Sequence, residues 1–409
     1  MTPLNSISHS DSDSSNRVLP VLILLFVGSG CAALIYEIVW LQMLQLIVGS
    51  TAISLGVLLG TFMGGMCLGS LALPHFISSR WHPLKVYAVL ELGIAIVGIL
   101  ILFSITHIEG LYSAFSHGSS GILVRGLIGG ACLLPPTVLM GATLPAMARW
   151  VETTTRGVSW LGFFYGGNIA GAVCGCLLAG FYFLRVHDMA VATYFAAAVN
   201  VTVAALALLL AAVTRYHNPI PDISSNPEQP APYARWVYCT IAISGFCALG
   251  AEVIWTRLLS LMLGGTVYTF SNILAVFLIG LGIGSSLGAS IARTASSPRI
   301  ALGMCQLLLA IAISWSAYMI SQSLPYWPID PTLSLTPWYT FQLDLARCMW
   351  VILPAACLWG ASFPFALAAV ASQKQDPGHL VARVYTVNTA GAILGALAFS
   401  FLIMPQQGS

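Results

Sequence analysis

The stretch SGCAALIYEIVWLQMLQLIVGST at residues 29–51 decides the fold, because the chain carries it twice. It aligns without gaps to SGFCALGAEVIWTRLLSLMLGGT at residues 244–266. Both copies are apolar, and each has a glutamate followed three residues later by a tryptophan. An acid inside a membrane helix is costly. Its return at the equivalent position therefore indicates a repeated structural or functional role.

The composition around these copies is that of a polytopic membrane protein. Of 409 residues, 58% are hydrophobic and 7% are charged, and the mean hydropathy is +0.89. Apolar runs of roughly 20 residues or more recur, as a helix that crosses about 30 Å of hydrocarbon requires. We therefore predict an all-α membrane protein with eleven transmembrane helices. The predicted spans are 18–43, 46–74, 86–106, 121–148, 158–184, 189–213, 235–261, 266–292, 299–322, 341–371 and 380–404.

The similarity continues beyond the two copies. LPPTVLMGATLP at residues 134–145 matches LPAACLWGASFP at residues 353–364, and a Tyr-x-x-Asn-x-x-Gly pattern follows in each half. Six predicted helices separate equivalent points, so both halves face the same way and form two parallel-oriented repeats. The first repeat has six helices and the second has five, so its final helix is missing from the pattern.

This pattern predicts four segments along the chain. A polar, Ser-rich N-terminal tail at residues 1–16 is expected to be disordered, and the first six-helix membrane repeat covers residues 17–215. A Pro-rich linker at residues 216–234 leads to the second membrane repeat at residues 235–409, which is truncated after its fifth helix.

Most lysines and arginines fall in the loops on one side of this arrangement. Because short basic loops stay in the cytoplasm, the N-terminus is predicted to be cytoplasmic. We expect an integral protein of a bacterial inner (plasma) membrane, with the lipid bilayer as its surroundings.

The repeated acids, Glu37 and Glu252, are the first candidates for a binding site. If both face the axis between the repeats, two carboxylates would form a site for a cation or a proton, with Trp40 and Trp255 as cation–π walls. In the alternative interpretation, each glutamate fixes its own helix by accepting hydrogen bonds from a neighbour.

A second candidate layer lies near mid-membrane, where Asn168 and Asn388 each follow a tyrosine, Tyr165 and Tyr385, on the same helix face. Amides and phenols need partners in hydrocarbon. Hydrogen bonding between helices is the interpretation we favour over a ligand.

Two further charged residues, Arg257 and Glu91, have an uncharged glutamine at the equivalent position of the other repeat, Gln42 and Gln306. Arg257 lies one turn beyond Glu252, and it could snorkel to the outer surface or pair across the interface with Glu37. Glu91, near the cytoplasmic edge of its span, is expected at a solvated helix end.

Several classes of site are not supported by the sequence. The ten cysteines include no Cys-x-x-Cys, so we predict neither a metal site nor a disulfide framework, and we predict no cofactor. No nucleophile elbow or catalytic acid–base pair is found, so no catalytic residue is assigned and enzyme activity of this chain stays open. A net charge of +2 offers no nucleic-acid footprint.

The duplicated Glu-[Ile/Val]-[Val/Ile]-Trp block, the Gly-Ala-[Thr/Ser]-[Leu/Phe]-Pro turn and the Tyr-x-x-Asn-x-x-Gly helix resemble the integral-membrane region of the fused MFS-type/spermidine synthase-like proteins. The likeness covers nearly all of residues 17–405. It implies a membrane region followed, in that family, by a cytoplasmic aminopropyltransferase-like domain of Rossmann-type fold. No part of such a domain occurs in this chain, so aminopropyltransferase activity would lie elsewhere.

Two functions remain open at this point. The first is a membrane module that binds or transports a small cationic or amphipathic molecule, for which a polyamine would suit two carboxylates. The alternative is a structural or regulatory membrane anchor for an aminopropyltransferase-like domain or subunit.

Overall fold

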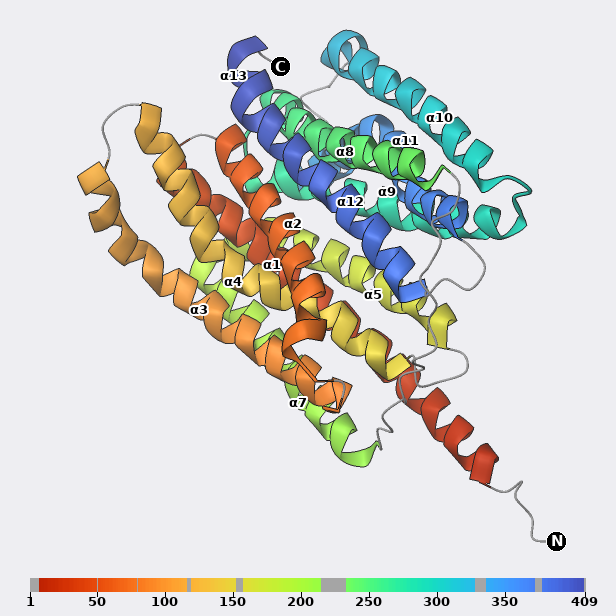
Figure 1. Ribbon diagram of the computed structural model, residues 1–409. Helices are drawn as coiled ribbons and strands as arrows, with labels where there is room; N and C mark the ends of the chain where they lie inside the picture. Colours follow the sequence, from red (N-terminus) through yellow and green to blue (C-terminus); the bar gives the residue numbers. More distant parts are fainter. Residues whose placement is uncertain are drawn as a thin grey trace, which may run out of the picture.

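The computed structural model describes residues 7–49, 51–78, 80–115, 119–151, 157–214, 233–327, 336–371 and 377–407. Throughout these ranges the regular structure is helical, without a strand (Figure 1). Eleven of the helices there are long and apolar enough to cross a membrane, and each corresponds to one predicted span. The prediction of an all-α membrane protein with eleven transmembrane helices is confirmed.

The first half contains six of these spans. Its helices are α1 (Ile7–Val48), α2 (Thr51–Phe76), α3 (Pro83–Phe115), α4 (Ser119–Val151), α5 (Gly157–Leu178), η1 (Ala179–Phe183), α6 (Leu184–Val186) and α7 (Met189–Val213). The π-turn η1 and the short α6 continue α5. Helix α1 begins at Ile7, so residues 7–16, predicted as a disordered tail, extend this helix instead; adding turns to an existing helix requires no new nucleation.

The second half contains the other five spans. Its helices are α8 (Ala234–Leu263), α9 (Val267–Thr294), α10 (Pro298–Tyr318), η2 (Met319–Ser323), η3 (Leu324–Tyr326), α11 (Pro337–Val370), α12 (Pro377–Ala398), η5 (Phe399–Ile403) and α13 (Met404–Gln407). The predicted linker at residues 216–234 lies almost wholly outside the described residues, so the domain boundaries remain predictions.

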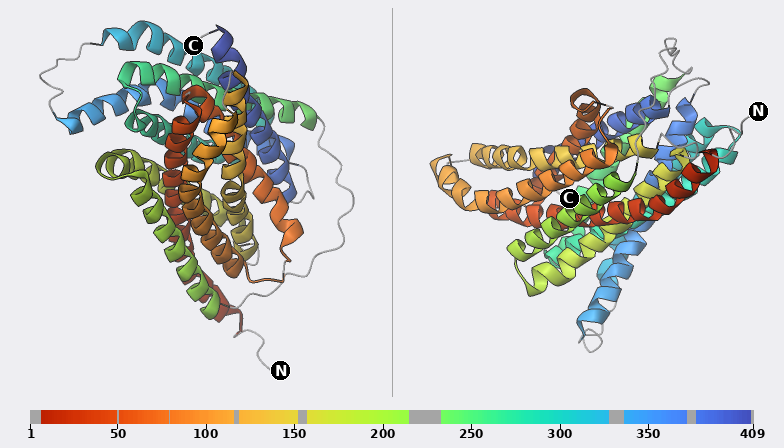
Figure 2. Two further views of the ribbon diagram at one scale, coloured as in Figure 1. Left: turned by 90° about the vertical axis from the view of Figure 1, so that its left-hand side faces the viewer. Right: turned by 90° about the horizontal axis from the view of Figure 1, so that it is seen from below.

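The two halves form neighbouring bundles. In Figure 1 the red-to-lime helices of the first half lie below and to the left of the green-to-blue helices of the second, and Figure 2 shows the same grouping from two other sides. Large apolar side chains such as Leu127, Leu209 and Ile311 are exposed on the outside of this assembly. Such an apolar exterior suits a surface that faces lipid.

The repeat is visible in how the helices approach one another. In the first half, α5 packs on α1 so closely that a Cβ on Gly171 would meet the backbone carbonyl of Val27. In the second half, α12 packs on α8, and a Cβ on Gly391 would meet the carbonyl of Ala242. These are equivalent positions in the two repeats. Small residues thus create the same close helix pair twice, as expected for membrane helices.

The contact between the halves is also repeated. Helix α2 packs against α12, and α9 packs against α5. At the centre of one contact, Gly56 of α2 faces the side chain of Ser400. At the equivalent place in the other, Gly180 faces the side chain of Ser271 of α9. Each contact therefore joins one glycine and one serine, with the serine always from the second half.

We expect Gly180→Ser to destabilise the protein by about 1–3 kcal/mol, because the new side chain would overlap Ser271. The second change Ser271→Gly should restore most of the loss, since it exchanges the two side chains across the same contact. Thermal unfolding of the purified variants measures both effects. Gly166→Ser is the control, because no atom lies within 4 Å of a Cβ at Gly166. Equal losses in the single and double variants would contradict this packing.

Matched irregularities lie beside these contacts. The π-turns η1 and η5 occupy equivalent positions, at the ends of α5 and α12. Each is adjacent to the serine–glycine contact of its interface, since Gly180 lies within η1 and Ser400 within η5. Single π-turns inside α-helices are often found at functional sites.

Candidate functional site

The centre of the candidate site is a pair of carboxyl groups, one from each half. Glu37 on α1 is 4% exposed, and Glu252 on α8 is 2% exposed. The two are near enough for the charge of Glu252 to act on Glu37. Both also act on the thiol of Cys176 in α5, whose Sγ donates a hydrogen bond of 3.2 Å to the backbone oxygen of Ser271 in α9. The carboxyl pair therefore lies where α1, α5, α8 and α9 converge between the halves.

The depth of this pair follows from the helix ends. Glu37 lies eleven residues before Val48, the last residue of α1 (48 − 37), and Glu252 lies eleven before Leu263, the last of α8 (263 − 252). At about 1.5 Å per residue, both lie roughly 16 Å from that end, near the middle of a layer about 30 Å thick.

One oxygen of the carboxyl pair lacks a polar partner in the described part of the chain. Glu252 Oε1 is buried without a hydrogen-bond partner among the described residues. The ion pair found in the described ranges lies elsewhere, between Asp344 and Arg347. Two ionised carboxylates in a medium of low dielectric constant repel each other strongly. The arrangement is therefore suited to hold a proton or a bound cation between the acids.

The two tryptophans pack inside their own halves. Trp40 lies 6.5 Å from Phe62, and Trp255 lies 6.4 Å from Phe277, measured between ring centroids at equivalent positions of the repeat. Trp40 also stacks on Tyr36 at 5.3 Å. In the described parts of the chain, cation–π contacts are formed by other residues. This packing accounts for both tryptophans, and their role as walls of a cation site remains a prediction.

The asparagine layer has the same geometry in both halves. The backbone and amide oxygens of Asn168 lie against Gly30 of α1, and those of Asn388 lie against Gly245 of α8. Both amides are half-buried. This contact favours helix packing over ligand binding as the role of the amides. Of their companions, Tyr385 is half-buried, and the side chain of Tyr165 lies outside the described residues.

Arg257 and Glu91 differ in exposure. Arg257 is exposed and forms no ion pair within the described ranges, so the pairing with buried Glu37 is not found. Its place five residues after Glu252, about 140° around the helix, turns it outward. The expectation of a solvated end for Glu91 is wrong. This carboxyl is 0% exposed, because α1 covers it and Ser29 donates a 2.6 Å hydrogen bond to its Oε1.

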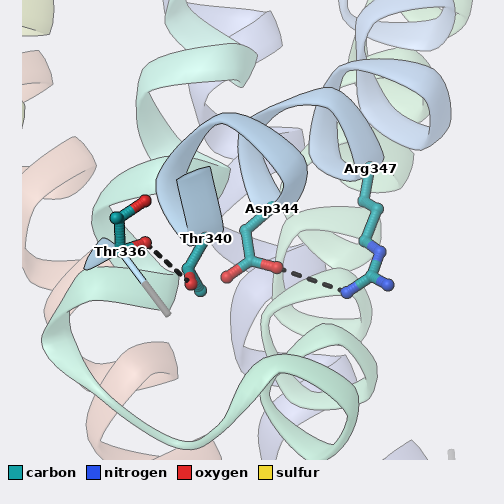
Figure 3. Close-up of polar contacts among 4 residues, drawn as sticks. All are labelled: Thr336, Thr340, Asp344 and Arg347. Carbon is teal, nitrogen blue, oxygen red and sulfur yellow. Dashed lines mark hydrogen bonds and ion pairs between the residues drawn. The ribbon is translucent and has the colours of Figure 1, made fainter. Parts of the chain in front are cut away.

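A buried ion pair in α11 was missed by the sequence reasoning (Figure 3). Arg347 Nη1 lies 3.3 Å from Asp344 Oδ1, and both side chains are buried. Tyr268 of α9 lies beside Asp344, and Asn272 of α9 lies beside Tyr268. The sequence does contain a signal for this pair, because Asp344 and Arg347 are opposite charges three residues apart inside an apolar span.

The start of α11 positions this pair. Thr336 caps the helix by accepting a hydrogen bond from the backbone nitrogen of Tyr339, and Thr340 Oγ1 lies 3.4 Å from the oxygen of Thr336 (Figure 3). The cap fixes the first turn of α11, from which Asp344 follows one turn after Thr340.

We expect Asp344→Asn to destabilise the protein by about 3–5 kcal/mol, because Arg347 would remain as a buried charge without its counter-ion. Adding Arg347→Gln should recover most of this loss. Thermal unfolding followed by tryptophan fluorescence measures both steps. A double variant less stable than Asp344→Asn alone would show that Arg347 has another partner.

In the described ranges, no group of three or more His, Cys, Asp or Glu side chains could hold a metal ion. The cysteines there are free, and four of them, Cys31, Cys176, Cys247 and Cys348, lie in or against apolar clusters.

The sequence has a partial match among curated proteins. No family model matches the chain. It is 26% identical, over 185 residues, to a protein named Polyamine aminopropyltransferase 2 from Streptomyces coelicolor; the match covers 44% of this chain and 31% of that protein. The chain thus matches about a third of the length of this curated relative.

A solved structure is similar over most of the chain. It is a bacterial homologue of the human lysosomal transporter Spinster in an inward-facing and unoccupied conformation. The TM-score is 0.54 at 15% identity, and the match covers 94% of this chain and 81% of that one. At this identity the likeness concerns the fold. The chain is an integral membrane protein, and its fold is similar to that of this transporter homologue.

Proposed function

We propose that the chain is a membrane transport module for a small cationic molecule, bound between the halves by Glu37 and Glu252. The observation that carries this proposal is the pairing of these two acids. They come from equivalent positions of the repeat and are both buried, and Glu37 lies near enough to Glu252 to be influenced by its charge. Neighbours of both acids, such as Ile38 and Val253, belong to the same apolar cluster.

A purely structural role explains this arrangement less well. A structural carboxylate is normally matched by hydrogen-bond donors or a cation. Here Glu252 Oε1 has no partner in the described part of the chain, and a like charge is the neighbouring group. A site of this type is stabilised by a bound cation, and the axis between parallel repeats is where transporters of such architecture bind substrates.

The number of carboxylates in the site indicates which class of cation it would bind. Two carboxylates from opposite sides suit a molecule with two or more amino groups, and the name of the curated relative makes a polyamine the first probe. The transporter-type fold favours this function over the alternative of a membrane anchor for an aminopropyltransferase-like domain. Placement in a bacterial inner membrane with a cytoplasmic N-terminus belongs to the same proposal.

The test uses the purified chain in liposomes. We expect binding and uptake of labelled spermidine, weaker binding of the lipophilic monocation tetraphenylphosphonium, and neither for the anion glutamate. Liposomes without protein give the background. Equal signals for spermidine and glutamate, or no signal above background for either cation, would overturn the proposal.

A further inference from the structure

A second buried carboxyl group lies outside the carboxyl pair. Glu91 of α3 is fully buried, and its Oε1 accepts a 2.6 Å hydrogen bond from Ser29 Oγ of α1. Its other oxygen, Oε2, is buried without a hydrogen-bond partner in the described residues. The mechanism proposed above does not use this group.

The surroundings of Glu91 contain hydroxyl groups and no cation. Tyr87 of α3 lies beside it, and Tyr36 of α1 is near enough to be influenced by its charge. The Oη of Tyr36 is itself buried and without a hydrogen-bond partner in the described residues. The other helices packed on α3 are α4 and α7, and their described residues add no charged or titratable group to those acting on Glu91. An ionised carboxylate here would be an uncompensated buried charge, which proteins avoid.

The second repeat shows what a purely structural group at this place looks like. The residue equivalent to Glu91 is Gln306 (91 + 215). Its Nε2 donates a 2.9 Å hydrogen bond to Ser362 Oγ, which donates in turn to the backbone oxygen of Leu358. A neutral amide thus satisfies the packing in one half. The first half has an acid at the same position, although an amide would avoid the cost of a buried charge.

We propose that Glu91 is a proton-binding site of the transport cycle, separate from the Glu37–Glu252 pair. In the conformation described here the carboxyl group holds the proton and is buried against Ser29. When the helices rearrange and water reaches Glu91, the proton leaves to water and the carboxylate is hydrated. The inference rests on the proposed transport function, for which it supplies the coupling ion.

The proton fits this site better than a metal ion. A cation such as Ca²⁺ takes six or more oxygen ligands, often from several carboxylates. Glu91 is a single carboxyl group with three hydroxyls nearby, and one of its oxygens already accepts from Ser29. A proton requires only the second oxygen.

Helix α1 connects the two sites. It carries Ser29 and Tyr36, which face α3, and it also carries Glu37 of the carboxyl pair. Ser29 and Glu37 are eight residues apart, or roughly 12 Å along the helix axis. A shift of α1 on cation binding would therefore move Ser29 relative to Glu91. Binding at two sites is linked when both sites shift the position of the same rigid element, and α1 can be that element here.

The experiment compares Glu91→Gln with the unchanged protein in liposomes, using labelled spermidine. Glu91→Gln reproduces the amide of the second repeat, so we expect it to fold. An acid-outside pH gradient should drive accumulation by the unchanged protein. In Glu91→Gln this accumulation should be lost, while spermidine exchange without a gradient stays at the unchanged level. Asp188→Asn, an exchange of an exposed acid for its amide, is the control.

A second measurement detects the proton without a substrate. Infrared spectra at neutral pH should show a protonated-carboxyl band that disappears in Glu91→Gln and shifts in Ser29→Ala, both made in a background with Glu37→Gln and Glu252→Gln. If the unchanged protein does not handle spermidine, the proposed function fails and the band alone decides the proton site. Gradient-driven accumulation that survives Glu91→Gln, dependence on sodium instead of protons, or a missing band would each overturn the inference.

Discussion

Spermidine binding is expected to disappear when Glu37 and Glu252 are both changed to glutamine. Each substitution preserves size and removes one charge from a buried pair. A hydrogen bond to a charged group contributes about 1.5–3 kcal/mol. Losing two such contacts should therefore weaken binding by about a hundredfold or more. Each single variant should retain part of the affinity, because one carboxylate remains.

The same double variant should be at least as stable as the unchanged protein. Removing two like charges from a buried site relieves their repulsion, and no described cation is left unpaired by the change. Binding is measured by equilibrium dialysis and stability by thermal unfolding. Asp188→Asn is the matched control, since it changes an exposed acid at a helix cap that asparagine also fills. Unchanged affinity in a folded double variant would remove Glu37 and Glu252 from the site.

Among the changes that add a group to a close helix contact, Gly171→Ala is expected to have the largest effect on stability. A methyl group there would meet the backbone of Val27, which cannot move without displacing α1. Overpacking of this kind costs about 1–3 kcal/mol, and a clash with backbone places the effect at the upper end. Gly391→Ala should cost a similar amount, because Gly391 meets Ala242 in the equivalent helix pair. Thermal unfolding in detergent is the measurement.

Gly166→Ala, five residues earlier in α5, should have the opposite sign. Gly166 is exposed, and no atom lies within 4 Å of a Cβ there. Glycine within a helix is less stable than alanine by about 0.5–1 kcal/mol, so this variant should gain stability. A loss in both variants would mean that α5 tolerates no change in general, and the proposed contact between Gly171 and Val27 would not be the cause.

Much of the fold could be predicted from the sequence, because the thickness of the hydrocarbon core sets the minimum length of every spanning helix. All eleven spans were found, including those of α4 and α11 that contain prolines. The parallel repeats followed from counting helices between equivalent motifs. The π-turns could not be predicted, since η1 and η5 have ordinary apolar sequences and arise from how α5 and α12 pack.

The candidate site was predicted in part. The sequence identified Glu37 and Glu252, because a repeated acid in an apolar helix is rare enough to stand out. It could not tell which face each helix turns inward. For this reason the contact of Trp40 with Phe62 could not be predicted, and its role beside a cation remains a prediction. Glu91 was misplaced by its nearness to a helix end, because the covering contact with Ser29 comes from another helix.

The serine–glycine contacts between the halves restrict how this molecule can be assembled. The first half supplies a glycine at both contacts, Gly56 and Gly180, and the second half supplies a serine at both, Ser271 and Ser400. Two copies of the first half would leave gaps, and two copies of the second would collide. Only unlike bundles fit. Each half of the chain is therefore shaped to pack against the other half and not against a second copy of itself.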